Sequence, residues 1–249
     1  MMQNSNEILI RVYRLLELYK TGELGGEKMP EDENPHLPKQ SLENYLYFSL
    51  PMALNYQRNS YVLWECANRT WNDVETQTVF SPKAVIDMSE EELKDKLTRY
   101  KVALQQNKQP IIWRTLCNTI ERDFKGDIRL LFSTNNYSVA KIKKYMLTNK
   151  KDFPYLSGNK IMNYWLHVIE QRTDVIFLDR NHISIAPDTH IIQASEKLGI
   201  ITSDEKLKSN VQDIVANRWE ELLANTEYCS IDIHTPMWLW SRSKFKIDL

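Results

Sequence analysis

Two segments in the second half of the chain carry side chains suited to chemistry at a carbon atom. Lys160 lies in the run LSGNK, two residues after Gly158, and Asp188 lies in the run APDTH. A lysine amine whose pKa is lowered by burial or nearby charge can attack an electrophilic carbon and form an imine. A carboxylate in a site that excludes water can stabilise positive charge on a reacting group. This pair of residue types suits bond cleavage at a carbon that becomes positively charged.

Each residue also has a simpler structural explanation. A lysine at the start of an amphipathic helix is ordinarily a solvated side chain, and an aspartate before a helix is ordinarily an N-cap. Asp188 can serve as both cap and catalyst, because the helix dipole favours its charged form. The histidines His182, His190 and His234 show no ligand spacing with Cys229, so we expect no metal site.

The flanking sequence predicts helices around both residues. A turn punctuated by Pro154 and Gly158 opens a helix of about three turns that carries Lys160. Asp188 is the predicted cap of a helix over residues 189–198, which stops at Gly199.

Apolar spacing predicts further helices elsewhere in the chain. They cover residues 8–19, 111–124, 138–147 and 211–223. Residues 41–71 are apolar and aromatic throughout and predict one or two buried helices, whereas residues 175–185 fit either a short extended piece or a loop. We therefore predict an all-α protein.

Composition allows one substantial domain or two small lobes that share a cleft. The chain has 249 residues, 42% hydrophobic, and a formal net charge of -1, so it lacks the global positive field of a strong non-specific nucleic-acid binder. Any DNA contact must be local. Five lysines lie just before the Lys160 turn: Lys141, Lys143, Lys144, Lys150 and Lys151. Such a run is ordinarily a solvated face, but its position just before the turn favours a local DNA contact.

The three cysteines Cys66, Cys117 and Cys229 are far apart and show no CxxC spacing. This argues against a disulfide framework, a zinc finger and an iron–sulfur cluster, and it suits a reducing cytoplasm. No stretch approaches the length of a membrane span, and residues 1–7 lack the features of a signal peptide. We expect a soluble, cytoplasmic protein.

The two chemistry-bearing segments resemble the signature of the helix-hairpin-helix glycosylase superfamily, which includes the endonuclease III and 8-oxoguanine glycosylase families. Gly158-Asn159-Lys160 is similar to the end of the family's hairpin, and Pro187-Asp188-Thr189-His190 is similar to its later capped helix. Two upstream runs, LPMALNYQRNS and FSPKAVIDMSEEELKDKL, resemble further family helices in the correct order. The resemblance covers roughly residues 41–199.

This resemblance implies a single glycosylase unit, residues 1–249, with two helical lobes around a DNA-binding cleft. Residues 41–125 would form the first helical lobe, and residues 126–200 the lobe with the hairpin and the catalytic residues. Residues 1–40 and 201–249 would pack together on the outside. Lys160 and Asp188 would face each other across the cleft.

The implied activity is that of a DNA glycosylase with AP lyase activity on duplex DNA that contains a damaged or modified base. Lys160 would attack C1′ and form a Schiff base, while the Asp188 carboxylate would stabilise charge on the sugar. The resemblance and local charge place DNA contacts at Gln57, Arg58, Lys150, Lys151, Ser157, Gly158, Asn159 and His190. Candidates for the pocket of a flipped base are Tyr164, Trp165, His167, Trp238 and Trp240. We expect a monomer, nucleoid-associated if the source is a prokaryote.

Three features depart from the family pattern. Leu156 stands where the usual hairpin has its first glycine. Lys160 and Asp188 are 28 residues apart, more than in the better-known families, which implies a longer helix or a loop inserted around residues 174–182. The C-terminal cysteine cluster of many endonuclease III relatives is missing, so no iron–sulfur cluster is expected.

Three other functions remain open from the sequence. An N-glycosidase on a free modified nucleoside or nucleotide needs the same carboxylate, and the near-neutral charge does not require DNA. A monofunctional glycosylase against hypermodified bases of foreign DNA would serve defence. A non-catalytic module would bind abasic or distorted DNA by the hairpin alone.

Overall fold

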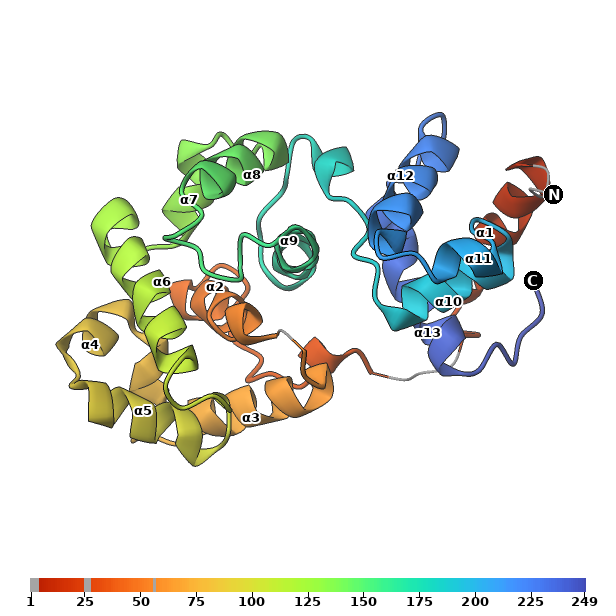
Figure 1. Ribbon diagram of the computed structural model, residues 1–249. Helices are drawn as coiled ribbons and strands as arrows, with labels where there is room; N and C mark the ends of the chain where they lie inside the picture. Colours follow the sequence, from red (N-terminus) through yellow and green to blue (C-terminus); the bar gives the residue numbers. More distant parts are fainter. Residues whose placement is uncertain (1–4, 25–27, 56) are drawn as a thin grey trace. The chain divides into compact units, whose positions relative to one another are not determined.

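The computed structural model describes residues 5–24, 28–55 and 57–249, and within these residues the secondary structure is helical with no β-strand (Figure 1). The all-α prediction is confirmed. The described chain forms two compact units. The central unit is residues 28–180, and the terminal unit combines residues 5–24 with residues 181–249. The predicted lobe of residues 41–125 lies within the central unit, whereas the lobe of residues 126–200 is divided between the two.

The central unit consists of α-helices joined by short turns. Its α-helices are α2 (Leu42–Ser49), α3 (Ser60–Asn72), α4 (Pro82–Asp87), α5 (Glu90–Arg99), α6 (Gln109–Phe124), α7 (Arg129–Thr134), α8 (Val139–Thr148) and α9 (Asn159–Arg172). Its 3-10 turns are η1 (Pro30–Asp32), η2 (Pro51–Leu54) and η3 (Gln77–Phe80), and η4 (Arg180–His182) begins at its last residue.

Aromatic side chains build the core of the central unit. α2 and α9 pack against each other, and α9 is seen end-on in Figure 1. Trp165 of α9 is fully buried, and its Nε1 donates to Ser49 Oγ of α2 at 3.1 Å. Trp113 of α6 is also fully buried and donates to the carbonyl of Val79 at 2.8 Å. These bonds let large aromatic rings be buried without leaving an unsatisfied N–H group.

The terminal unit is held together around α13. Its helices are α1 (Ser5–Lys20), α10 (Thr189–Leu198), α11 (Ser203–Lys206), α12 (Val211–Leu223) and α13 (His234–Arg242), with the 3-10 turn η5 (Ser230–Ile233). α13 packs against both α10 and α1, so the two ends of the described chain share one core. Trp219 of α12 is fully buried and donates to Ser195 Oγ of α10 at 2.9 Å.

The helix boundaries follow the start and stop signals of the sequence. α10 and α12 have the predicted bounds, and Asp188 is the N-cap of α10. α10 ends at Gly199, whose φ of 82° is readily adopted only by glycine. α6 begins two residues earlier than predicted, with Pro110 in its first turn.

The segment of residues 175–185 is a loop that contains the 3-10 turn η4, and it forms no strand. Its first residues alternate in burial, with Val175 and Phe177 buried and Ile176 and Leu178 exposed. The backbone N–H of Leu178 donates to the carbonyl of Tyr137 at 3.1 Å, and no ladder develops in the described residues. Burial in this segment thus alternates as the sequence pattern indicates, but no strand among the described residues pairs with it.

No helix in the described ranges has both the length and the apolar character needed to cross a bilayer.

Candidate functional site

The turn between α8 and α9 is fixed from within by apolar anchors and hydrogen bonds. Phe153 and Leu156 are buried, and the N–H of Ser157 donates to the carbonyl of Phe153 at 3.0 Å. Leu156 is only 1% exposed and so acts as an anchor of the turn. Tyr155 adopts the left-handed conformation, with a φ of 60°. The turn is therefore well defined by its own buried side chains and hydrogen bonds.

Gly158 is needed for close packing of the backbone. Its φ of -67° is accessible to any residue, but a Cβ atom built there would lie 3.1 Å from the carbonyl oxygen of Tyr155. That carbonyl accepts the N–H of Gly158 at 3.0 Å and cannot easily move. Gly158 is also the N-cap of α9 and provides no side-chain cap. The first N–H groups of α9 thus lack a side-chain partner at the N-cap.

Lys160 lies in the first turn of α9 and is exposed, as are Asn159, Lys150 and Lys151. Lys143 of α8 differs from these lysines because its Nζ donates to Asn163 Oδ1 of α9 at 3.0 Å. Lys143 thus ties the two helices together, whereas the lysines of the turn face solvent.

A second basic segment lies against this turn, which sequence reasoning missed. The ammonium group of Lys108 lies 5.1 Å from the centre of the Tyr155 ring, a cation–π contact. Arg58 donates to the backbone carbonyls of Val102 at 2.7 Å and Lys101 at 3.2 Å, so it holds the loop before α6 in place. Gln57 is exposed next to it. The sequence shows no periodic signal for the contact between Lys108 and Tyr155, which are distant along the chain.

Asp188 caps α10 with one of its two carboxylate oxygens. Its Oδ1 accepts the N–H of Ile191 at 2.9 Å, and its Oδ2 has no hydrogen-bond partner in the described part of the chain. The side chain is half-buried. The cap therefore leaves one anionic oxygen for another interaction.

Beside Asp188, His190 is positioned by α13. Its Nδ1 lies 3.2 Å from Ser241 Oγ, and its ring meets the Trp238 ring at a centroid distance of 5.3 Å in a T-shaped arrangement. The Arg242 guanidinium lies 5.1 Å from the centre of the same Trp238 ring. Trp238 is 8% exposed. His190 and Trp238 therefore meet between α10 and α13, and Asp188 caps the start of the same helix α10.

The other predicted pocket residues lie in packed surroundings. Trp165 is a core residue, and His167 is buried on the same helix. Trp240 is buried, donates from Nε1 to the carbonyl of Ile247 at 2.8 Å, and packs edge-on against Phe245. Tyr164 is half-buried one turn beyond Lys160. In this arrangement, Trp165 and Trp240 serve packing.

Tyr164 is hydrogen-bonded to a buried acid that the sequence did not single out. Its hydroxyl lies 3.0 Å and 3.1 Å from the two carboxylate oxygens of Glu31, which is only 5% exposed. Burial raises the pKa of Glu31, and the nearby Arg172 guanidinium opposes this shift only partly. Arg172 itself forms an ion pair with Asp32.

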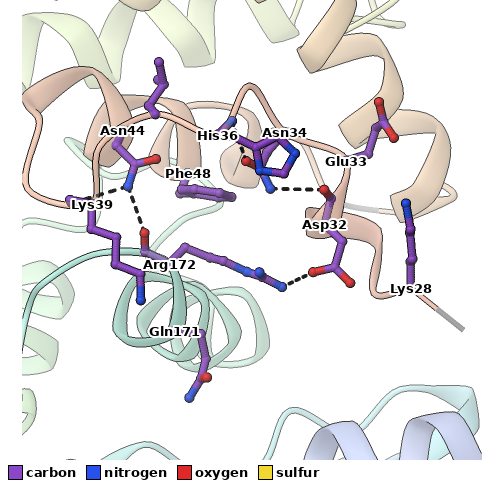
Figure 2. Close-up of a pocket in the computed structure, with 11 residues that line it drawn as sticks. Lys28, Asp32, Glu33, Asn34, His36, Lys39, Asn44, Phe48, Gln171 and Arg172 are labelled. Atoms are coloured by element: carbon purple, nitrogen blue, oxygen red, sulfur yellow. Dashed lines mark hydrogen bonds and ion pairs between the residues drawn. The ribbon is translucent and has the colours of Figure 1, made fainter. Parts of the chain in front are cut away.

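A cavity of about 530 Å³ lies beside this ion pair, between the η1 segment, α2 and the end of α9. Figure 2 shows the Arg172 side chain reaching toward Asp32, with the Phe48 ring close by. Its lining includes Lys28, Asp32, Glu33, Asn34, His36, Leu37, Lys39, Asn44, Phe48, Gln171 and Arg172. The lining has three basic side chains, Lys28, Lys39 and Arg172, and two acidic ones, Asp32 and Glu33. None of the predicted site residues lines this cavity.

The two groups of predicted residues belong to different units. Lys160, Gln57, Tyr164 and the basic turn belong to the central unit, while Asp188, His190 and Trp238 belong to the terminal unit. The meeting of Lys160 and Asp188 across a cleft stays a prediction. Among the residues that the structure describes, no group of three or more His, Cys, Asp or Glu side chains is arranged to hold a metal ion.

No protein-family model fits the chain, and no curated protein is significantly similar to it. The function must therefore be argued from the motifs and from the geometry within each unit.

Proposed function

We propose that the protein is a DNA glycosylase with AP lyase activity that removes a damaged or modified base from duplex DNA. Lys160 is the Schiff-base nucleophile, and Asp188 is the catalytic carboxylate. The observation that carries this proposal is the start of α9, where an internally anchored turn presents Lys160 to solvent beside N–H groups without a side-chain cap. Uncapped N–H groups at a helix start favour binding of a phosphate group.

The basic residues of the central unit support a local DNA-binding surface. Lys150, Lys151 and Lys160 are exposed around the turn, and Lys108 joins them through its contact with Tyr155. Each lysine that neutralises a phosphate releases counterions, which favours binding at low salt. A chain with a net charge of -1 can thus bind DNA through one locally positive face.

The proposed reaction requires one group from each unit. Lys160 gives up a proton and its amine nitrogen attacks C1′ of the flipped nucleotide, and the C1′–N bond breaks so that its electron pair leaves with the base, which takes up a proton. The free oxygen of Asp188 stabilises the positive charge that develops on the sugar. The substituted nitrogen then loses a proton and the C1′–O4′ bond breaks, with O4′ taking up a proton, so that the opened sugar is held on Lys160 as an imine. Loss of the C2′ proton from this imine expels the 3′ phosphate, and water releases the product from Lys160.

Borohydride trapping tests the nucleophile. We expect wild-type protein to form a covalent adduct with a duplex that carries an abasic site, or one of a panel of modified bases, and Lys160→Ala to form none. Lys144→Ala is the matched control, because Lys144 is an exposed lysine of the preceding helix α8, outside the turn. It should retain the adduct.

Other results would revise the proposal. An adduct that persists in Lys160→Ala assigns the amine to another residue. Base release without any adduct leaves a monofunctional glycosylase centred on Asp188. Absence of both on every duplex removes the DNA reaction, and a free modified nucleoside then becomes the substrate class to assay.

A further inference from the structure

A second cavity of the central unit, about 660 Å³ in volume, lies between α2, α3, α4 and α6. We call it the four-helix cavity. It is lined by Leu42, Glu43, Leu46, Trp71, Gln77, Thr78, Phe80, Ser81, Pro82, Glu121, Lys125, Gly126 and Asp127. None of these residues belongs to the proposed DNA site. Its volume falls within the range of small-molecule sites, about 300–1,000 Å³.

The inner wall of the four-helix cavity is apolar and aromatic. Trp71 is half-buried and meets Phe80 edge-on at a centroid distance of 5.1 Å. Tyr47 supports both rings from the core, with centroid distances of 5.9 Å to Trp71 and 5.5 Å to Phe80. Leu46 is also buried. A wall of rings held by the core is suited to an apolar or aromatic ligand body.

The rim of the cavity is acidic. Glu43 and Glu121 lie at its edge, and neither carboxylate has a hydrogen bond or ion pair within the described residues. Asp127 already forms an ion pair with Arg129, whose Nη2 lies 2.7 Å from Asp127 Oδ2. Hydrogen bonding to Arg129 lowers the pKa of the Asp127 carboxyl group. Among the described lining residues, Lys125 is the one basic side chain. Glu43 and Glu121 therefore make no hydrogen bond or ion pair in this part of the structure, and the positive charge close to Glu121 on α4 is Lys83, which is itself paired with Asp87.

The end of α6 leaves room for one of these carboxylates. Lys125 and Gly126 both adopt left-handed conformations, with φ values of 55° and 82°. A Cβ atom at Gly126 would lie only 2.8 Å from Glu121 Oε1, so the absence of a side chain lets the carboxylate lie against the turn. Glu121 thereby remains at the edge of the cavity.

We infer that the four-helix cavity binds an organic cation, in which an ammonium group is attached to an aromatic or aliphatic body. The body would lie against Trp71 and Phe80, and the ammonium group would lie near Glu43 and Glu121. A cation placed over the Trp71 indole would add a cation–π attraction to this charge preference. The same carboxylates oppose phosphate and carboxylate ligands, which separates this cavity from the DNA-binding surface.

Three probes with one indole body and different charges test this inference: tryptamine is a cation, tryptophol is neutral, and indole-3-acetate is an anion. We expect isothermal titration of the full chain to show tryptamine binding about fivefold to tenfold more tightly than tryptophol, with no measurable binding of indole-3-acetate. The preference for tryptamine over tryptophol should shrink in about 0.5 M salt, because these carboxylates are accessible to solvent.

Variants identify the carboxylates. Glu121→Gln and Glu43→Gln should each weaken tryptamine binding by about twofold to fourfold and leave tryptophol binding unchanged. Glu91→Gln is the matched control, since Glu91 is an exposed acid of α5 that does not line the cavity. All three replacements lie on the surface or rim, so they should fold like the wild type.

The inference is overturned by equal affinity for tryptamine and tryptophol, by preferred binding of indole-3-acetate, or by no heat with any probe. It is also overturned if Glu91→Gln weakens tryptamine as much as Glu121→Gln does. Binding of a lysine- and leucine-containing peptide without binding of tryptamine would assign the cavity to protein docking instead.

Discussion

Replacing Asp188 by asparagine and by alanine separates its structural role from its proposed catalytic role. Asp188 Oδ1 accepts the N–H of Ile191 at the start of α10, which packs against α13. Asparagine offers the same oxygen and is as good an N-cap as aspartate, whereas alanine offers none. Only the charge is lost in Asp188→Asn, while both the charge and the cap are lost in Asp188→Ala.

The expected magnitudes follow from these two contributions. Loss of the cap should cost about 1 kcal/mol of the free energy of unfolding, which lowers the Tm by about 2–4 °C in a chain of this size. Asp188→Asn should unfold close to the wild-type temperature. If the carboxylate stabilises charge on the sugar, both variants should slow base release by about a hundredfold or more.

Thermal unfolding and single-turnover base release on the duplex panel measure the two effects separately. An Asp188→Asn variant with wild-type base release would refute the catalytic role of the charge. An Asp188→Asn variant as unstable as Asp188→Ala would show instead that the hydrogen bond to Ile191 requires a charged acceptor, and the loss of activity would then have a structural cause.

Two further predictions concern the central unit. Burial raises the pKa of Glu31 in the folded state, so its contribution to the free energy of unfolding is complete below the ordinary value of 4.5 and is lost as the pH rises. Urea unfolding should therefore show Glu31→Gln gaining stability relative to the wild type between about pH 5 and about pH 8. An equal effect of the replacement at both pH values would contradict this cause. Replacing Lys150 and Lys151 by alanine should reduce the slope of log affinity against log salt by about 0.9 for each phosphate that is no longer neutralised, as measured by fluorescence anisotropy on a duplex, and an unchanged slope would place these lysines outside the interface.

Local signals explain how much of the fold could be predicted. Asp188 and Gly199 define both ends of α10, and each acts through atoms within a few residues of itself. The same holds for Ser138, whose side chain caps α8. Such signals depend on hydrogen bonds between near neighbours in the chain, which a sequence displays directly.

The surroundings of the site depend on interactions that no local pattern displays. Tyr164 forms a hydrogen bond with Glu31, which is 133 residues away in the chain, and Trp165 forms one with Ser49, which is 116 residues away. Both aromatic residues lie on the helix that carries Lys160, and their spacing alone could not separate a base pocket from the core. Only the packing of η1 and α2 against α9 distinguishes the half-buried Tyr164 from the buried Trp165.

The strongest test of the whole proposal is a double variant, because Lys160 and Asp188 belong to different units of the fold. If both groups act on one sugar, they work as a unit, and Lys160→Ala with Asp188→Asn should slow base release little more than the more damaging single variant. If Lys160 only binds phosphate while Asp188 acts alone, the two effects should multiply, as is usual for independent sites. Single-turnover base release at saturating protein decides between these outcomes. The matched control is a second double variant that combines Lys144→Ala and Asp188→Asn. Multiplied effects would refute a shared reaction centre and leave Lys160 as a DNA-binding residue.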